Sequence, residues 1–484
     1  MWHEERLLVG GELVPAEGNR TYPTIDPTTG EPLGEAADAS VGDARRAVES
    51  ARKAFDTTTW ATDQAFRAAC LRQLHDALIA NQEDLRSLLI ADNGLPFMLT
   101  QGPGLETPIK IVDWYAGLLD KFEFREDLGV AEVMGGQHNR WVEKEPVGVV
   151  AAIVPYNYPV QITLAKLVPA LAAGCTVVVK APPQCPWITA ALGRIVAENT
   201  DIPAGVVNFL TGSSAEVGEA LVTDPDVDMV SFTGSTAVGR RIMAAASDTV
   251  KKTFLELGGK SAFIVMDDAD LSLATMFSGF TICSHAGQGC AITSRLLVPE
   301  AKLDEAVEQV AGVLAGVPYG DPRDPGTMMG PLITEAQRQR VDGYVQGAIA
   351  DGATVVTGGK APDRPGYFYE PTLLTGVAPD ARAAQEEIFG PVLVIHGYRD
   401  DDDAVAIANN SIFGLSGAVF GTDPDRATSV ARRIRAGTIS VNGGMYYGPD
   451  APFGGYKQSG IGREMGVPGL AEYLELKTIA LPAG

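Results

Sequence analysis

The sequence predicts an α/β fold, and three observations support this prediction. From residue 146 onward, short β-branched runs alternate with helical stretches, and a second such series begins near residue 260. Strands and helices that alternate at this interval are typical of right-handed βαβ units, which form parallel sheets. The chain has 484 residues, too many for one ordinary core, so two or three domains are expected.

The expected elements follow in chain order. Residues 41–93 have the helical spacing of alanine, leucine and charged residues, with an interruption at 57–60 and a stop at Asn93-Gly94. The first alternating series has expected strands at 148–154, 175–179, 206–210 and 229–232, and expected helices at 165–173, 188–199, 215–222 and 236–246. The second has expected strands at 261–265 and 295–298, and expected helices at 302–314 and 334–351. Two further segments, 140–144 and 473–479, alternate apolar and polar residues as edge strands do.

Charge and cysteine content exclude several classes of partner. The chain carries 61 acidic and 38 basic side chains, and its formal net charge of −23 repels nucleic acid and anionic membranes alike. The N-terminus lacks the basic segment of a secretory signal, and prolines interrupt the most apolar region, 147–179. Five scattered cysteines without C-x-x-C spacing favour neither disulfides nor a metal site. A cytoplasmic location is expected, with no metal, nucleic-acid or membrane partner.

A carboxylate, a thiol and an amide stand in segments rich in glycine or proline. Glu256 precedes Gly258-Gly259, and Cys290 ends the run Gly287–Cys290, in which missing side chains allow the backbone to approach a ligand closely. A thiolate is a strong nucleophile, and a nearby carboxylate can activate the water that releases an acyl group. Asn157 lies between two prolines, a rigid mount for a donor to a developing oxyanion. Together these residues suggest a covalent enzyme.

Each of these residues has a structural alternative when it is taken singly. A free cysteine is most often a buried structural thiol, and Cys283, seven residues before Cys290, is interpreted in that way. A lone glutamate such as Glu256 is usually a solvated surface residue. The catalytic interpretation therefore depends on several motifs that occur together.

Six segments occur in the order found in one family, and they run from Pro155 to Glu464 in a chain of that family's usual length. They are Pro155–Pro159, Phe232–Gly239, Leu255–Lys260, Gly287–Cys290, Glu387–Pro391 and Pro452–Glu464. With these segments the chain resembles the aldehyde dehydrogenase superfamily. One such motif is weak evidence, whereas six in the same order are not expected by chance.

The resemblance implies an aldehyde dehydrogenase-like fold of three parts. A Rossmann-type dinucleotide-binding domain is expected over 1–123 and 147–257, and a second α/β domain, the catalytic domain, over 258–457. A small β oligomerisation element is expected over 124–146 and 468–484. In the family this element pairs across subunits, so the resemblance implies a homodimer or homotetramer.

The resemblance also implies NAD(P)-dependent oxidation of an aldehyde to its carboxylic acid. Cys290 would form a thiohemiacetal and then a thioester, with Asn157 as oxyanion donor and Glu256 as general base, and hydride would pass to the nicotinamide between the two steps. A coenzyme-A-acylating branch usually lacks a base at the Glu256 position, so hydrolysis is favoured. Lys166 and Glu464 match positions used for proton relay, and a salt bridge without a catalytic part is an equal alternative.

A glycine-rich turn between an expected strand and helix predicts the cofactor site. Gly234 and Ser235 precede the expected helix at 236–246, whose N-terminal dipole and free N–H groups attract phosphate. This turn is not the G-x-G-x-x-G fingerprint and alone is weak evidence. By resemblance, Ser235 contacts the pyrophosphate, Lys180 the adenosine ribose and Glu387 the nicotinamide ribose. The other cofactor-binding positions implied by the family are Pro155, Gly234, Gly239, Leu257, Gly258 and Phe389.

Three positions depart from the residues usual in the family. Three residues after Lys180, where many NAD-preferring members have a glutamate for the ribose hydroxyls, this chain has Pro183. Proline neither accepts those hydrogen bonds nor repels a 2′-phosphate, so the cofactor is expected to be NAD or NADP, with NAD slightly favoured. His285 stands where asparagine is common, which could alter hydrogen bonds or charge in the loop. Tyr156 replaces a tryptophan and keeps an aromatic body.

Apolar and aromatic residues near the motifs predict the substrate pocket. The family positions are Tyr158, Ile162, Tyr447 and Phe453, with Met445 and Tyr446 nearby. No arginine is among them, so a dianionic semialdehyde lacks a carboxylate clamp, and aliphatic or aromatic aldehydes are favoured as substrates. Each aromatic residue taken singly is as readily a core residue.

Two other hypotheses belong to different classes. His285 could serve as the base for Cys290 in a cofactor-independent thiol hydrolase or esterase. A catalytically inactive binding or structural protein is disfavoured because Cys290, Glu256 and Asn157 are all present.

Overall fold

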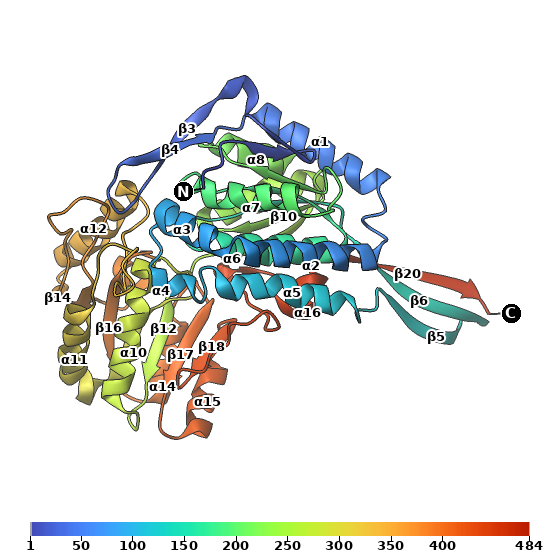
Figure 1. The fold of residues 1–484 in the computed structure, drawn as a ribbon. Coiled ribbons are helices and arrows are strands. Elements are labelled where there is room, and N and C mark those ends of the chain that lie inside the picture. The colour runs from blue at the N-terminus through green and yellow to red at the C-terminus, as the bar shows by residue number, and fades with distance from the viewer. Residues whose placement is uncertain (1, 484) are drawn as a thin grey trace.

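Three β-sheets of three or more strands organise the chain, and the computed structural model describes residues 2–483 (Figure 1). Two are large sheets of eight and seven strands with helices on their faces, and the third is a three-stranded sheet that projects from the rest of the molecule. A two-stranded ribbon joins β3 Thr21–Ile25 to β4 Pro32–Ala37. The predicted α/β fold class is confirmed.

The first sheet has a parallel centre and antiparallel edges, in the order β19-β11-β10-β7-β8-β9-β1-β2. Its parallel strands are β7 Val149–Ile153, β8 Thr176–Lys180, β9 Val207–Leu210, β10 Met229–Thr233 and β11 Lys252–Glu256. The strands joined by antiparallel pairing are β1 Leu7–Val9, β2 Glu12–Val14 and β19 Gly460–Ile461, of which β2 and β19 are the two edges. The sheet is therefore mixed, whereas the alternating pattern predicted only its parallel part.

Two groups of helices cover the two faces of this sheet. One face carries α2 Gln64–Ala80, α3 Gln82–Asn93, α5 Glu106–Leu119, α6 Pro159–Ala173 and α7 Pro186–Asn199. The other carries α1 Val41–Thr57, α8 Ala215–Thr223 and α9 Thr236–Ala246. The predicted breaks after residues 57 and 93 are confirmed. The predicted start of α6 at residue 165 is wrong, because Pro159 begins the helix at a position where no amide hydrogen is needed.

The strand order reverses at β7, which lies between β8 and β10. From β7 the chain moves outward through β8 and β9, and it then returns to the other side of β7 with β10 and β11. In an open α/β sheet, a ligand crevice forms beyond the carboxyl ends of the strands at such a reversal. Because β7 leads into the Pro155 segment and β10 into Gly234, both segments start at this crevice.

The second sheet repeats this mixed design in the order β14-β15-β16-β13-β12-β17-β18. Its strands are β12 Ser261–Val265, β13 Thr293–Pro299, β14 Thr354–Thr357, β15 Thr372–Thr375, β16 Val392–Tyr398, β17 Ser416–Phe420 and β18 Thr438–Val441. Only β14 is antiparallel. One face packs on α10 Leu271–Cys283, α11 Leu303–Gly316 and α12 Glu335–Ala350, and the other on α14 Asp401–Asn409 and α15 Pro424–Arg433.

The third sheet joins distant parts of the chain. Its central strand β6 Gly136–Pro146 pairs with β5 Arg125–Val133 on one side and with β20 Leu474–Pro482 on the other. The prediction of an edge strand at 140–144 is wrong, because β6 is hydrogen bonded along both sides, whereas β20 is an edge strand of this sheet. Within residues 2–483, no helix combines the length and the apolar character needed to cross a membrane.

Removal of the buried Arg67 guanidinium tests how the carboxyl end of α6 is held. Arg67 is 2% exposed and donates to the carbonyl oxygens of Ala172, Trp60 and Ala61 at 3.1, 2.8 and 3.1 Å. Arg67→Met leaves these buried carbonyls without donors, so we expect it to lower the free energy of unfolding by roughly 3 kcal/mol.

The measurement is the midpoint of urea denaturation, with Arg72→Met as control. Arg72 lies on the same helix, is 46% exposed and pairs only with the exposed Asp120, so its loss is expected to cost under about 0.5 kcal/mol. Equal effects of the two substitutions would contradict the conclusion that Arg67 holds the end of α6.

Candidate active site

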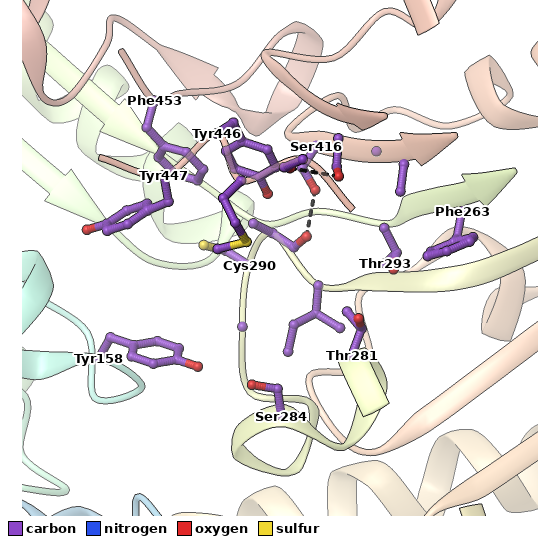
Figure 2. A pocket seen from close by; sticks show the side chains of 18 of the residues that line it. Tyr158, Phe263, Thr281, Ser284, Cys290, Thr293, Ser416, Tyr446, Tyr447 and Phe453 are labelled. Atoms are coloured by element: carbon purple, nitrogen blue, oxygen red, sulfur yellow. Dashed lines mark hydrogen bonds between the residues drawn. The ribbon is translucent and has the colours of Figure 1, made fainter. Parts of the chain in front are cut away.

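Cys290 lies in the loop between α10 and β13, and its side chain faces a cavity of about 420 Å³ (Figure 2). Glu256, the last residue of β11, and Asn157, which follows β7, line the same cavity. The structure therefore brings together the thiol, the carboxylate and the amide that the sequence singled out. They come from three segments that meet between the two large sheets.

The Cys290 loop begins with an unusual run of left-handed backbone. His285, Ala286 and Gly287 have φ angles of 45°, 53° and 73°. A Cβ atom on Gly287 would lie 2.1 Å from the carbonyl oxygen of Gly390. The interpretation that Gly287 allows the approach of a ligand is therefore wrong, because the chain itself occupies that space. Gly287 permits close packing of the loop against residues 390–391.

Two polar side chains fix the loop on either side of Cys290, and the sequence analysis assigned a role to neither. Gln288 is fully buried, donates to the carbonyl oxygens of His285 and Pro331, and accepts from the Ile333 amide at 3.0 Å. Ser416, on β17, donates to the carbonyl oxygen of Ala291 at 2.6 Å (Figure 2). In the sequence, the signal for Gln288 was its position between two glycines, Gly287 and Gly289.

Glu256 is buried, and the half-buried side chain of Cys290 lies beside it. Glu256 is 1% exposed, and burial together with the nearby charge of Glu464 raises its pKa to about 8. The nearby Cys290 thiol and the positive charge of Lys166 partly offset this rise in the pKa. Burial raises the pKa of the Cys290 thiol well above its ordinary value, and the negative charge of Glu256 raises it further. A neutral thiol therefore lies beside a carboxyl group that can accept its proton.

Hydrogen bonds to the residues on either side of Asn157 hold its backbone in place. The side chain of Asn93, at the end of α3, donates to the carbonyl oxygen of Tyr156 at 2.5 Å, and the Ile162 amide donates to the carbonyl oxygen of Tyr158. Asn157 itself is 2% exposed, and its amide oxygen has no hydrogen-bond partner among the described residues. The backbone contacts therefore position the Asn157 side chain, and its amide group faces the cavity.

Lys166 and Glu464 form a buried ion pair beside this cavity. The Lys166 Nζ lies 2.6 Å from the Glu464 Oε1, and the two side chains are 0% and 7% exposed. The ammonium also lies 4.6 Å from the centre of the Phe254 ring. Glu464 lines the cavity, and the charges of both residues act on the pKa of Glu256. The three ionisable side chains thus form one electrostatic cluster.

The predicted phosphate-binding residues gather where β10 enters α9. Ser235 caps α9 by accepting a hydrogen bond from the Val238 amide. Glycine is required at position 239, because a Cβ there would lie 2.6 Å from the Leu257 side chain. The buried hydroxyl of Thr233 has no partner in the described chain. At the end of β8, Lys180 donates to the Gly212 carbonyl oxygen at 3.2 Å, and burial lowers its pKa to about 8.

The second predicted cofactor group lies at the boundary between the large sheets. The Glu387 carboxylate accepts from the Gly259 amide at 2.9 Å, and burial raises its pKa to about 7. A Cβ on Gly258 would lie 2.5 Å from this carboxylate, so the glycine permits its close approach. Phe389 has a φ of 61°, and its ring meets the ring of Tyr156 edge to face at 5.9 Å. Tyr156 therefore packs as an aromatic body beside the Pro155 segment.

All four predicted substrate residues line the cavity, and they surround the thiol. Tyr158 lies on one side of Cys290, and Tyr447 and Phe453 lie on another (Figure 2). Lining residues that the sequence analysis missed include Gln161, Phe277, Thr281, Ser284, Ile292, Thr293 and Phe420. Phe277, Thr281 and Ser284 follow helical spacing on one stripe, which was the signal that could have identified them.

His285 is buried apart from the cavity and is a poor candidate for a base. It is fully buried and absent from the cavity lining, and its ring packs on that of Tyr158 at 5.4 Å. Burial lowers the pKa of the His285 imidazole to about 3, and neither ring nitrogen has a hydrogen-bond partner within residues 2–483. The imidazole is too weakly basic to activate Cys290, which argues against the thiol hydrolase hypothesis.

Nearly the whole chain matches the model of a known family. The model of the aldehyde dehydrogenase family matches residues 13–479. The chain belongs to the aldehyde dehydrogenase family. A mitochondrial aldehyde dehydrogenase of Leishmania tarentolae is 38% identical over 98% of this chain and 94% of its own length. A betaine aldehyde dehydrogenase of Bacillus subtilis is 36% identical over 98% of this chain and 97% of its own length.

Solved structures of aldehyde dehydrogenases have the same fold. Betaine aldehyde dehydrogenase from Staphylococcus aureus, in complex with NAD+, has a TM-score of 0.95 at 36% identity, covering 99% of this chain and 94% of that one. Aldehyde dehydrogenase C from Pseudomonas syringae, in complex with NAD+ and octanal, has a TM-score of 0.92 at 36% identity, covering 99% and 96%. The predicted aldehyde dehydrogenase fold and its oxidoreductase class are thereby confirmed.

A methyl group on Gly287 tests the packing of the Cys290 loop. Gly287→Ala combines a left-handed φ with a collision against Gly390, so we expect a loss of roughly 2–4 kcal/mol in the free energy of unfolding and a fall in kcat as Cys290 shifts. Gly343→Ala is the control, because Gly343 lies within α12 with no atom near its Cβ position. That variant should be as stable as the parent or about 0.5–1 kcal/mol more stable.

Proposed function

We propose that this chain oxidises an apolar aldehyde to its carboxylic acid with NAD+ or NADP+, through a covalent intermediate on Cys290. The observation that carries the proposal is the cavity that the Cys290 thiol, the Glu256 carboxyl and the Asn157 amide share. Nucleophile, base and oxyanion donor are the groups that acyl transfer from an aldehyde requires.

The residues at the strand reversal fit a dinucleotide. The α9 N-terminus with Gly234 and Ser235 offers amide groups to a pyrophosphate, and the unpartnered Thr233 hydroxyl lies beside it. Lys180 and Glu387 would hold the two riboses, and Pro155, Gly239, Leu257, Gly258 and Phe389 would shape the walls. When bound, the nicotinamide supplies the hydride acceptor of the reaction. The NAD+ in the Staphylococcus aureus and Pseudomonas syringae structures supports this assignment.

The side chains of this protein perform the covalent chemistry. Glu256 takes the proton of the Cys290 thiol, the sulfur attacks the aldehyde carbon, and the Asn157 amide donates to the resulting oxyanion. Once hydride has left the carbon, a thioester remains on Cys290. The proton taken from the thiol first leaves Glu256 toward solvent, so that the ionised Glu256 can take a proton from water, which attacks the thioester. The carbon–sulfur bond breaks, the acid leaves, and the sulfur regains a proton as the Cys290 thiol. Lys166 and Glu464 would carry protons from Glu256 toward solvent.

The polarity of the cavity favours uncharged substrates. Its lining contains the carboxyl groups of Glu256 and Glu464 and no arginine or lysine, while aromatic and aliphatic side chains form much of the wall. A substrate carboxylate would meet repulsion without a cationic partner. Aliphatic or aromatic aldehydes therefore suit the site better than semialdehydes. The octanal bound by the Pseudomonas syringae relative is consistent with this class.

The three sheets support a division of the chain into functional parts. We infer a dinucleotide-binding domain over 1–123 and 147–257, a catalytic domain over 258–457, and an oligomerisation element over 124–146 and 468–484. The projecting sheet exposes large apolar side chains on its outer strands, including Leu128, Val130, Leu476 and Leu481, which favours a homodimer or homotetramer. The five cysteines carry free thiols, which suits a cytoplasmic location.

The raised pKa of Glu256 predicts the pH dependence of the reaction. A base must be ionised, and a pKa of about 8 leaves Glu256 largely protonated at pH 7, so kcat/KM should rise as the pH passes through about 8. Glu256→Gln should lower kcat by about 100-fold or more and remove this rise. The measurement is the absorbance of reduced nicotinamide with hexanal across pH 6–10.

His285→Asn is the control for this prediction. Asparagine tolerates the left-handed backbone at this position, and His285 lies outside the cavity lining, so folding and activity should be kept. Loss of oxidation in His285→Asn with retention in Glu256→Gln would reverse the assignment of the base.

Pro183 predicts tolerance of NADP+. Pro183 lies three residues after Lys180, the last residue of β8, and offers no charge against a 2′-phosphate. Pro183→Glu should lower kcat/KM for NADP+ relative to NAD+ by about tenfold, the equivalent of one charged contact of roughly 1.5 kcal/mol. Gln184→Glu adds the same charge one residue later and should change the ratio less. If Pro183→Glu left the ratio of kcat/KM for the two cofactors unchanged, the adenosine ribose would not bind near residue 183.

A further inference from the structure

A small hollow lies at the amino ends of β12 and β17 in the second sheet. It has a volume of about 10 Å³, which is enough for one atom or molecule of the size of water. Its lining includes three basic side chains, Lys260, Arg295 and Arg435, and two hydroxyl side chains, Ser261 and Ser416, but no acidic residue. Such a lining favours a negatively charged occupant.

Lys260 brings a buried ammonium group to this hollow. The residue ends the Leu255–Lys260 motif and is 1% exposed, and its Nζ has no hydrogen-bond partner within residues 2–483. Because side chains alternate between the two faces of a strand, Lys260 and Ala262 lie on the same face of the sheet, which α14 and α15 cover. The hollow lies on that face, against Ala408 of α14. A buried ammonium without a partner is strongly unfavourable, so it loses its proton or is balanced by an anion.

Neighbouring basic groups add positive charge that no carboxylate balances. Arg295 is 3% exposed, and its guanidinium donates to three backbone carbonyl oxygens at 2.8–2.9 Å. Burial and the charge of Arg295 lower the pKa of Lys260 to about 7. Lys457, nearby, donates to two carbonyl oxygens, and burial together with the charges of Arg435 and Arg295 lowers its pKa as well. These groups repel one another, and an anion among them would relieve that repulsion.

The two acidic residues whose charges act on Lys260 are engaged elsewhere. Glu387 accepts from the Gly259 amide at 2.9 Å, and Glu386 accepts from Tyr344 at 2.7 Å. Both charges raise the pKa of Lys260, but neither residue lines the hollow. They therefore reduce the excess of positive charge without giving the Lys260 ammonium a partner.

We propose that this hollow binds a single anion of the size of chloride, held by the Lys260 ammonium beside Arg295 and Arg435. The hollow is too small for phosphate or a carboxylate ligand. This anion site does not depend on the proposed function, although it lies close to the catalytic loop. The Ser261 hydroxyl lies 3.0 Å from the Ser416 hydroxyl, which holds the Ala291 carbonyl beside Cys290 (Figure 2). A bound anion would stabilise this arrangement from the opposite side of Ser261.

The direct test is anomalous diffraction from crystals of the full chain soaked in sodium bromide. Bromide is only slightly larger than chloride and is located by its anomalous scattering. We expect a peak at the Lys260 Nζ in the parent and no peak there in Lys260→Met. Bromide found only at surface positions of the parent, or a peak that persists in Lys260→Met, would overturn the proposal.

Thermal unfolding tests the same site in solution. The full chain is compared in sodium chloride and in sodium gluconate at equal ionic strength, because gluconate is too large for the hollow. The parent should unfold about 1–2 °C higher in chloride, as expected for an anion at roughly ten times its Kd. Lys260→Met should lose this shift, and the control Lys110→Met, which removes an exposed lysine of α5, should keep it.

Two results in solution would contradict an anion at Lys260. The absence of a chloride shift in the parent would show that the site stays empty outside the crystal. An equal shift in the parent and in both variants would mark a general effect of salt on the surface. If Lys260→Met does not fold, the position of bromide in the parent crystals decides the question alone.

Discussion

The burial of Glu256 next to Cys290 is the constraint on which the rest of the site depends. A carboxylate at the end of a central strand loses its hydration, so its protonated form is favoured and its pKa rises to about 8. The same burial keeps the Cys290 thiol neutral. In the proposed reaction, the ionised form of Glu256 accepts the thiol proton as the sulfur attacks the aldehyde carbon.

Holding this pair requires a rigid loop, and the backbone around Cys290 is arranged for that purpose. Three consecutive left-handed residues turn the chain sharply after α10, and Gln288 ties the turn to residues 331–333. The left-handed conformation is unfavourable for His285 and Ala286, and the surrounding contacts must supply the compensation. Such strain is typical of segments that fix reacting atoms within narrow limits.

The same geometry couples the two halves of the molecule. Glu387 accepts from the Gly259 amide, just after the boundary between the two α/β units, while the Ser459 carbonyl oxygen accepts from the amide of Leu257, the last residue of the first unit. The residues proposed to hold the nicotinamide are therefore linked by hydrogen bonds to the strand that carries Glu256. A displacement of one sheet relative to the other would move the cofactor site and the base together.

The sequence by itself determined which reactive groups are present, because a thiol, a carboxylate and an amide lie in glycine- and proline-rich segments. The alternation of strands and helices also predicted parallel sheets. The sequence could not determine contacts between distant segments. The ion pair of Lys166 with Glu464 joins residues 298 positions apart, and the space that Gly287 leaves is filled by Gly390 rather than by a ligand. The exposure of Met276, Phe277 and Phe280 could not be predicted, because apolar residues occur on all sides of α10 and the pattern does not indicate which side remains exposed. Only the packing of that helix on the second sheet decided this, since exposure is a property of what covers a surface.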